Sequence, residues 1–314
     1  MRAVSELGQR AMGAVLDAGD ATASVACGNG SRVGNRLSSD CQTQVWAQTL
    51  GANITIDGSP KLKSTAFGLL AGADRQIGES DARLGLEAGA ERLNASDVLG
   101  GNGSTDISHA GLYVIANTGP LVVSGLLDAS YARYEFNRPT GIGDAASRPH
   151  ADIGSAGIQA AWPVQAGGWH VTPKLGVLYQ YQRLDGFDEH VASSSPLATA
   201  YGLDVRRDTY ITLAPYAKVS FAKTFQSGGV NYTPSLELGY RYDSRGDTPG
   251  VHATSQDGTS FLLAGRPVGR GSGLVGARIT ADHGGLWHVY LDYGGTFASH
   301  VRDNTLMLGF TRQW

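Results

Sequence analysis

Long apolar runs and clusters of basic residues are both missing from this sequence of 314 residues. The longest apolar runs, at 67–73 and 111–116, fall far short of the roughly 18 residues that a membrane-spanning helix requires. Any insertion into a membrane must therefore take the form of a closed barrel of strands. The formal net charge is −3 and no Lys/Arg-rich segment occurs, so we expect no nucleic-acid partner.

The motifs of several common enzymes are also absent. No GxSxG, HExxH or CxxC pattern occurs. A GxGxxG pattern at 271–276 lies between a loop and a strand-like segment, whereas a dinucleotide site requires a strand before the pattern and a helix after it. His288 with Asp292, or His300 with Asp303, resemble acid/base pairs. If the chain forms a barrel of strands, however, the wall of the barrel carries such polar residues simply to contact water or a helix inside it. We therefore expect no enzymatic activity, no cofactor and no metal site.

Glycine is abundant, with 44 residues, and tyrosine leads the aromatic residues with 13, while charged residues make up only 17%. This composition disfavours helical bundles and favours short strands with tight turns. From residue 43 onward apolar and polar residues alternate, as in 236–243 and 287–294. Alternation with a period of two is typical of strands that have one apolar and one polar face.

The links between these predicted strands are of two kinds. Every second link is short and has the composition of a hairpin turn, while the intervening links are longer and polar. The short links are 78–81, 117–120, 166–168, 227–229 and 282–285, and the long links are 57–63, 95–105, 137–150, 185–206, 244–271 and 298–302. This arrangement is typical of outer-membrane barrels, with short periplasmic turns and long extracellular loops. Five short and six long links predict an all-β fold over 43–314, a twelve-stranded antiparallel transmembrane β-barrel.

The last ten residues, 305–314, have the same alternation and end on an aromatic residue. The apolar residues at alternate positions are Leu306, Leu308, Phe310 and Trp314. A soluble sandwich would show the same period, but the last residues of a soluble domain are generally polar and frayed. A lipid-facing strand with its aromatic end at the membrane interface accounts for the pattern. The segment resembles the C-terminal assembly signal of Gram-negative outer-membrane proteins, with Gly309, Phe310 and Trp314 in matching positions and Arg312 where an aromatic residue is usual.

Residues 1–18 contain the predicted helix, because apolar residues recur there at three- and four-residue spacing and Gly19 follows as a stop signal. Twelve strands tilted by about 40° leave a bore of roughly 14 Å once side chains are counted, and a helix is about 10 to 12 Å across. The bore therefore accepts one helix. We expect this helix to plug the lumen, with Glu6, Gln9 and Arg10 contacting the wall.

In this fold the polar residues that alternate with the apolar ones in each predicted strand face the lumen. Charged residues there would be costly if they were dry and unpaired, so we expect them to pair with one another, with water or with the helix. The predicted lumen-facing residues are Asp74, Glu87, Lys174, Lys218, Glu237, Arg241, Arg278, His288 and Asp292.

Residues 19–42 form a Gly/Ser/Asp-rich linker that contains the only two cysteines, Cys27 and Cys41. The segment has no histidine partner for zinc, and an exported chain meets an oxidising compartment. We therefore expect a Cys27–Cys41 disulfide; the alternative is two unpaired thiols. Polar residues interrupt 1–18 where a signal peptide would need an apolar core, so we also expect the chain to be a fragment of a longer exported protein.

Several segments, in this order and spacing, resemble the C-terminal translocator domain of autotransporters, which is the β-domain of type V secretion. They are VWAQTLG at 45–51, FGLLAGADRQIG at 67–78, RLGLEAGAER at 83–92, GGWHVTP at 167–173, LYQYQ at 178–182 and LDYGGTF at 291–297. The resemblance implies a twelve-stranded barrel with an N-terminal helix in its lumen, through which an N-terminal passenger reaches the cell surface. Some members cut the passenger off at an Asn-Asn bond. No such bond occurs in residues 1–43, so we do not expect that cleavage.

Two functions remain after this comparison. The leading one is an outer-membrane translocator and surface anchor of a Gram-negative cell, with its long loops at the cell surface and its short turns in the periplasm. Its expected partners are outer-membrane lipids, the barrel assembly machinery and its own passenger, and the barrel is expected to be monomeric. The alternative is a freestanding porin-like channel that is plugged by its N-terminal helix.

Overall fold

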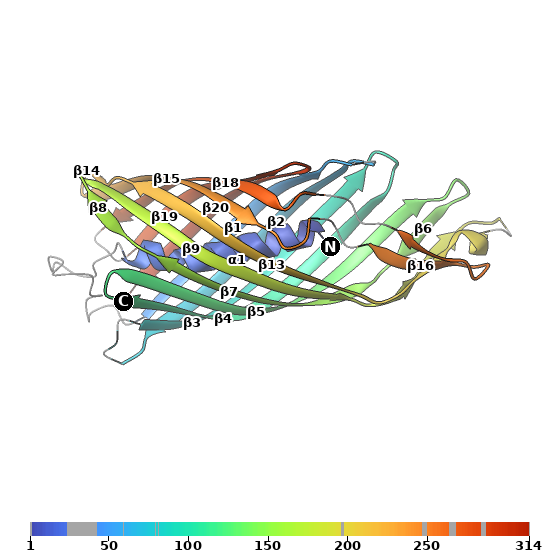
Figure 1. Cartoon of the computed structure of the whole chain (residues 1–314), viewed down its shortest axis with the longest axis horizontal. Helices are drawn as coiled ribbons and strands as arrows, with labels where there is room; N and C mark the ends of the chain where they lie inside the picture. The colour runs from blue at the N-terminus through green and yellow to red at the C-terminus, as the bar shows by residue number, and fades with distance from the viewer. Residues whose placement is uncertain are drawn as a thin grey trace.

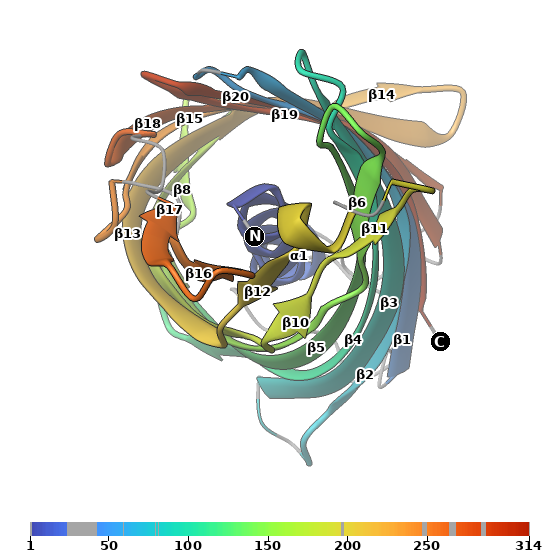
Figure 2. The same cartoon turned by 90° about the vertical axis from the view of Figure 1, so that its right-hand side faces the viewer.

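The protein is a barrel of long strands around a single helix, and Figures 1 and 2 show it from the side and along its axis. The structure is a computed structural model that describes residues 2–23, 43–58, 60–78, 80, 82–195, 198–246, 250–263, 268–283 and 287–313.

Twelve long strands form the wall, and consecutive ones pair antiparallel. They are β1 (Thr43–Ile56), β2 (Leu62–Gln76), β3 (Ala82–Asp97), β4 (Asn102–Thr118), β5 (Leu121–Pro139), β7 (His150–Ala161), β9 (Trp169–Leu184), β13 (Asp208–Ala222), β15 (Val230–Tyr242), β18 (Gly271–His283), β19 (Trp287–Ala298) and β20 (Val301–Gln313). β20 also pairs with β1, from Gln313 opposite Gln44 to Val301 opposite Ile56, so the wall closes without a free edge. The predicted closed twelve-stranded barrel is confirmed.

Shorter elements extend the wall at its two ends. They are β6 (Asp144–Ser147), β8 (Val164–Ala166), β10 (Phe187–Asp188), β11 (His190–Ala192), the 3-10 turn η1 (Ala198–Tyr201), β12 (Leu203–Val205), β14 (Phe225–Ser227), β16 (Val251–Ser255) and β17 (Ser260–Leu263). β10, β12, β16 and β17 form a separate small sheet, and Figure 1 shows β6 and β16 at one end of the barrel and β8 and β14 at the other. The barrel therefore has one end built from short hairpins and one end that carries additional structure.

Two of the links predicted to be long are tight turns. β3 continues to Asp97 and β4 begins at Asn102, where residues 95–105 were expected to form a loop. The Asp97 carboxylate accepts hydrogen bonds from the backbone N–H groups of Leu99 (2.8 Å) and Gly101 (3.0 Å), which fixes the turn. Likewise β19 ends at Ala298 and β20 begins at Val301. The polar composition of these segments led to the expectation of loops. In the structure the hydrogen-bonded strands continue into them, beyond the apolar part of the wall.

The two faces of the wall differ as a membrane barrel requires. Large apolar side chains at alternate positions are exposed on the outside, among them Phe67, Leu69, Leu84, Leu86, Leu112, Leu127, Leu175, Ile211, Leu213, Leu236, Leu238, Leu291, Leu306, Leu308 and Phe310. The positions between them point inward and include buried polar residues such as Gln48, Glu87 and Gln180. An apolar belt of this extent outside and a polar lumen inside are the reverse of a soluble protein.

Helix α1 (Arg2–Ala23) lies inside the barrel, as the view along the axis shows (Figure 2). It continues through Gly19, which was expected to end it at residue 18, because a glycine in a helix costs only about 1 kcal/mol relative to alanine. Its apolar side chains, including Leu7, Val15 and Leu16, are buried against the wall. No helix within the described ranges is both long enough and apolar enough to cross a membrane.

Candidate functional site

The lumen holds α1 through three groups of polar contacts, of which the first involves the start of the helix. Arg2 Nη1 lies 2.6 Å from Asp243 Oδ2, and Arg2 Nη2 lies 2.6 Å from Glu6 Oε1. Glu6 Oε2 in turn accepts a hydrogen bond of 2.7 Å from Arg241 Nη2. All four side chains are buried, so each charge depends on its neighbours in this alternating row. The row joins α1 to the end of β15.

A second group of contacts involves Ser5, which lies between Arg2 and Glu6, and Arg10, about one turn beyond Glu6. Ser5 Oγ donates to Gln180 Oε1 at 2.6 Å, and Arg10 Nε lies 3.2 Å from Asp303 Oδ2. Arg10 Nη2 also donates to Thr296 Oγ1 at 3.1 Å. These bonds connect α1 to β9 on one side of the lumen and to β19 and β20 on another. Gln9 is buried, but its amide has no hydrogen-bond partner among the residues the structure describes.

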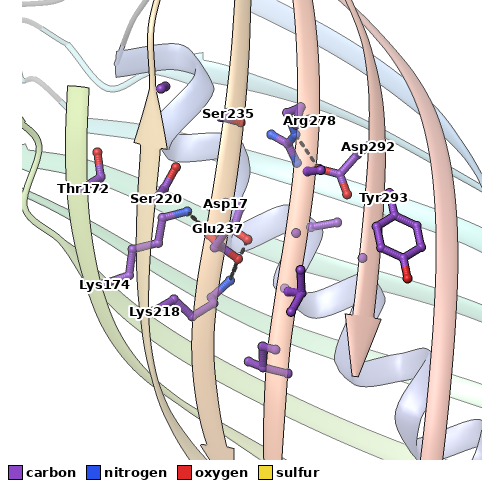
Figure 3. Close-up of a pocket in the computed structure, with 18 of the residues that line it drawn as sticks. Asp17, Thr172, Lys174, Lys218, Ser220, Ser235, Glu237, Arg278, Asp292 and Tyr293 are labelled. Carbon is purple, nitrogen blue, oxygen red and sulfur yellow. Dashed lines mark hydrogen bonds and ion pairs between the residues drawn. The ribbon is translucent and has the colours of Figure 1, made fainter. Parts of the chain in front are cut away.

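The third group centres on Asp17, near the other end of α1 (Figure 3). Asp17 lies 2.9 Å from Lys174 Nζ and 2.8 Å from Lys218 Nζ, and both lysines also contact Glu237, at 2.9 and 3.1 Å. Two acids and two amines therefore alternate between the helix and strands β9, β13 and β15. Gln159 Nε2 adds a hydrogen bond of 3.3 Å to the backbone oxygen of Leu16.

A cavity of about 610 Å³ lies beside the helix, and Figure 3 shows its polar lining. Lys174 and Lys218 line it together with Arg278 and Asp292, whose side chains pair at 2.7 Å between β18 and β19. The helix therefore does not fill the lumen completely. The remaining space is bordered by charges of both signs, which suits water and small polar solutes.

The other lumen-facing residues expected from the sequence lie away from the helix contacts. Asp74 forms a buried ion pair with Arg83 and accepts a hydrogen bond of 2.7 Å from the Tyr113 hydroxyl. His288 Nδ1 lies 3.4 Å from Asp282 Oδ2 on the neighbouring strand. Glu87 is buried on β3, in the neighbourhood of His109.

Several residues of these groups were not anticipated from the sequence. Arg2, Asp17, Asp243 and Asp303 each hold a partner across the lumen, although the polar parity marks Asp243 and Asp303 as inward residues. The inward parity and the expected helix were the available signals. Neither signal indicates how α1 is rotated about its own axis. That rotation decides which wall residue each helix residue contacts.

The C-terminal strand has the face pattern expected of an outer-membrane signal. Phe310 is exposed on the outside of β20, whereas Gly309 points into the lumen, where a side-chain carbon would collide with the ring of Tyr290. Tyr290 in turn donates a hydrogen bond to Gln48 on β1. Trp314, Cys27 and Cys41 lie outside the described residues, so the disulfide and the role of the terminal aromatic remain predictions.

Comparison with known proteins gives this barrel a family. The sequence-family model of the autotransporter beta-domain matches residues 45–294, and the chain belongs to this family. The resemblance that the sequence suggested is confirmed. Among solved structures, the translocator domain of the autotransporter NalP from Neisseria meningitidis superposes with a TM-score of 0.76 at 16% identity, covering 100% of this chain and 97% of that one.

Further relatives agree with this assignment. The beta domain of the Bordetella autotransporter BrkA has a TM-score of 0.68 at 17% identity, covering 87% of this chain and 100% of that one. An extracellular serine protease of Serratia marcescens is 23% identical over 296 residues, which is 88% of this chain and 27% of the protease. The chain thus spans about a quarter of the length of the curated relatives it matches.

Proposed function

We propose that this chain is the outer-membrane translocator and surface anchor of an autotransporter and that it supports export of an N-terminal passenger to the cell surface. The observation that carries the proposal is the position of α1, which lies in the lumen of a closed barrel with its first residues directed toward the end that bears β6 and β16 (Figure 1). Polypeptide before Arg2 would leave the barrel at that end. Membership of the autotransporter beta-domain family supports the same function.

The orientation in the membrane follows from the two kinds of link. We assign the end with β6, β11 and the small sheet of β10, β12, β16 and β17 to the outside of a Gram-negative cell. The opposite end, with its short hairpins, is assigned to the periplasm. The support for this orientation is the general rule that outer-membrane barrels have short periplasmic turns and longer external loops.

The partners follow from the same proposal. They are the outer-membrane lipids around the apolar belt, the passenger that precedes the helix, and the barrel assembly machinery. Gly309, Phe310 and Trp314 are the proposed signal for that machinery, on the strand that closes the barrel against β1. The protease activity named for the Serratia relatives stays with those proteins, because the match covers only 27% of their length. We attribute no enzymatic activity to this chain.

A surface-display experiment tests the proposal. A signal peptide and an epitope-tagged reporter are joined in front of residue 1, and the fusion is expressed in a Gram-negative host. Antibody labelling and protease treatment of intact cells should detect the reporter outside the cell. As a control, the same signal peptide and reporter without the barrel should remain in the periplasm.

The same experiment separates the two candidate functions. A reporter that stays in the periplasm, while the barrel is correctly assembled in the outer membrane, would contradict the translocator role. That result would favour a plugged porin-like channel. Heat-modifiable migration of the barrel on gels confirms that it is folded in either case.

A further inference from the structure

A second group of buried polar side chains lies on the lumenal face of β3, β4 and β5, separate from the contacts that hold α1. It consists of Glu87 and Glu91 on β3, His109 on β4 and Asp128 on β5. In the strand register Glu87 lies opposite Gly111, and Gly111 lies opposite Asp128. His109 precedes Gly111 by two residues and so shares its face of the sheet. Side chains from three neighbouring strands therefore converge on one patch of the wall.

Two glycines make room for this convergence. Gly111 separates the two carboxylates, and a side-chain carbon there would lie 2.6 Å from Glu87 Oε1. Gly89 lies opposite His109, and a side-chain carbon at that position would overlap the imidazole at Nε2. Because neither position carries a side chain, the carboxylate of Glu87 and the ring of His109 can lie over the backbone of the neighbouring strand. The wall thus forms a cradle with an imidazole and two carboxylates around it.

The spacing of the donor atoms suits a single metal ion. One ligand atom each from Glu87, His109 and Asp128 lies within 4.8 Å of the others, and His109 Nδ1 lies 3.1 Å from Asp128 Oδ2. Nitrogen and oxygen ligands bound to one zinc ion at about 2.0 to 2.2 Å stand roughly 3 to 4.4 Å apart. The upper limit of 4.8 Å in the structure is close to the largest of these separations. Ser130 Oγ donates to Asp128 Oδ1 at 2.7 Å and so orients that carboxylate from outside the group of ligands.

The polar atoms of this group are not satisfied by the protein. Glu87 is 6% exposed and His109 is 9% exposed, yet Glu87 Oε2 and His109 Nε2 have no hydrogen-bond partner in the described part of the chain. Glu91, also buried, adds a third carboxylate. Within the described ranges no lysine or arginine forms an ion pair with these acids. Buried carboxylates at this density are costly unless they take up protons or a cation joins them.

We infer that Glu87, His109 and Asp128 form a binding site for a divalent transition-metal ion of the zinc type. An imidazole nitrogen favours such an ion over magnesium or calcium, and the two carboxylates complete three protein ligands with water at the remaining positions. The ion neutralises the buried acids and links the side chains of three strands. This proposal departs from the expectation from the sequence that the protein binds no metal; no local sequence motif marks ligands on three separate strands. It is independent of passenger export.

Calorimetry on the purified, refolded full chain in detergent tests this inference. Metal is first removed with a chelator, and ZnCl₂ is then titrated into the wild type and into Glu87→Gln, Asp128→Asn and His109→Gln. We expect one equivalent of Zn²⁺ to bind to the wild type and each substitution to weaken binding by at least about tenfold, since even outer partners of metal ligands contribute that much. His288→Gln is the matched control, because it removes another buried lumenal histidine, and it should bind like the wild type.

A second measurement guards against variants that fold poorly. Glu87→Gln and Asp128→Asn keep the shape of the side chain, so the barrel should form in both. Zn²⁺ should raise the thermal unfolding midpoint of the wild type and of His288→Gln, and this shift should disappear in the two amide variants. Absence of Zn²⁺ binding by folded wild type, or equal binding by all five proteins, would overturn the inference. Calcium in place of zinc should give no binding that depends on His109.

Discussion

The helix meets two different walls of the same lumen. On one side its backbone lies close to β4, β5, β7 and β9, and Val15 and Leu16 are buried in an apolar cluster with residues of these strands. On the other side, strands β13 to β20, together with Lys174 of the adjoining β9, reach the helix mainly through long charged side chains, such as Lys218 to Asp17 and Arg241 to Glu6. The cavity of about 610 Å³ borders this second side. We call the first the packed wall and the second the ion-paired wall.

The difference shows how one helix is held without filling the bore. Apolar contacts contribute only where heavy atoms approach within about 4 to 4.5 Å, so the packed wall fixes the position and rotation of the helix. Lysine and arginine side chains extend across a gap and keep their bonds over a range of helix positions. The ion-paired wall can therefore adapt while the packed wall holds. If the lumen admits a passenger during export, as proposed above, one adaptable side would make room for it.

Removing the helix should have the largest effect on both walls. A chain that lacks residues 2–23 keeps all twelve strands and the closure of β20 on β1, so it should still fold. Its single-channel conductance in planar bilayers should rise severalfold, because a helix of about 10 to 12 Å otherwise occupies most of the bore. The full chain refolded in parallel is the control. Equal, large conductance of both proteins would mean that the helix does not occupy the lumen in the membrane.

Glu6→Ala should have the next largest effect, on the ion-paired wall. It leaves Arg2 and Arg241 buried beside each other, and loss of one partner of a buried pair costs about 3 to 5 kcal/mol. Hydrogen exchange of the 2–23 peptides, followed by mass spectrometry on the folded barrel, should become much faster. Glu135→Ala is the matched control, because its partner Arg148 is exposed and that pair contributes at most about 1 kcal/mol. Unchanged exchange in Glu6→Ala would mean that Arg2 and Arg241 find other partners or water.

These two walls also show what the sequence can and cannot predict. The strand number and the inward parity of Lys174, Glu237 and Asp292 follow from a period of two, since a shift by one residue would turn every side chain to the other face. The helix was recognisable from its own spacing. Its partners were not, because pairs such as Arg10 with Asp303 depend on the register between segments that are far apart in sequence.

Leu16→Ala should loosen the packed wall by a somewhat smaller amount. Leu16 is fully buried, and truncation of such a leucine costs about 2 to 5 kcal/mol, depending on how far the surroundings collapse. Exchange of the helix amides should accelerate at every salt concentration alike, because the lost contacts are apolar. Leu86→Ala, on the lipid-facing side of β3, removes the same group without touching the helix and should leave this exchange unchanged. The same acceleration in both variants would show that the barrel as a whole has been loosened.

Lys218→Met should have the smallest effect on hydrogen exchange of the helix. The salt dependence of this exchange distinguishes the two walls most directly. Lys174 remains between Asp17 and Glu237 in this variant, at 2.9 Å from each, so neither acid is left without an amine and the loss should stay below the roughly 3 to 5 kcal/mol of a buried pair that loses its partner. The double change Lys174→Met with Lys218→Met should cost more than the sum of the two single changes, because it leaves two acids facing each other with neither amine. Salt weakens contacts between charges beside a water-accessible cavity, so the wild-type helix should exchange faster in 1 M salt, and the double variant should lose most of this response. A double variant that responds to salt as the wild type does would place the salt-sensitive contacts at Arg2 and Arg10 instead of Asp17.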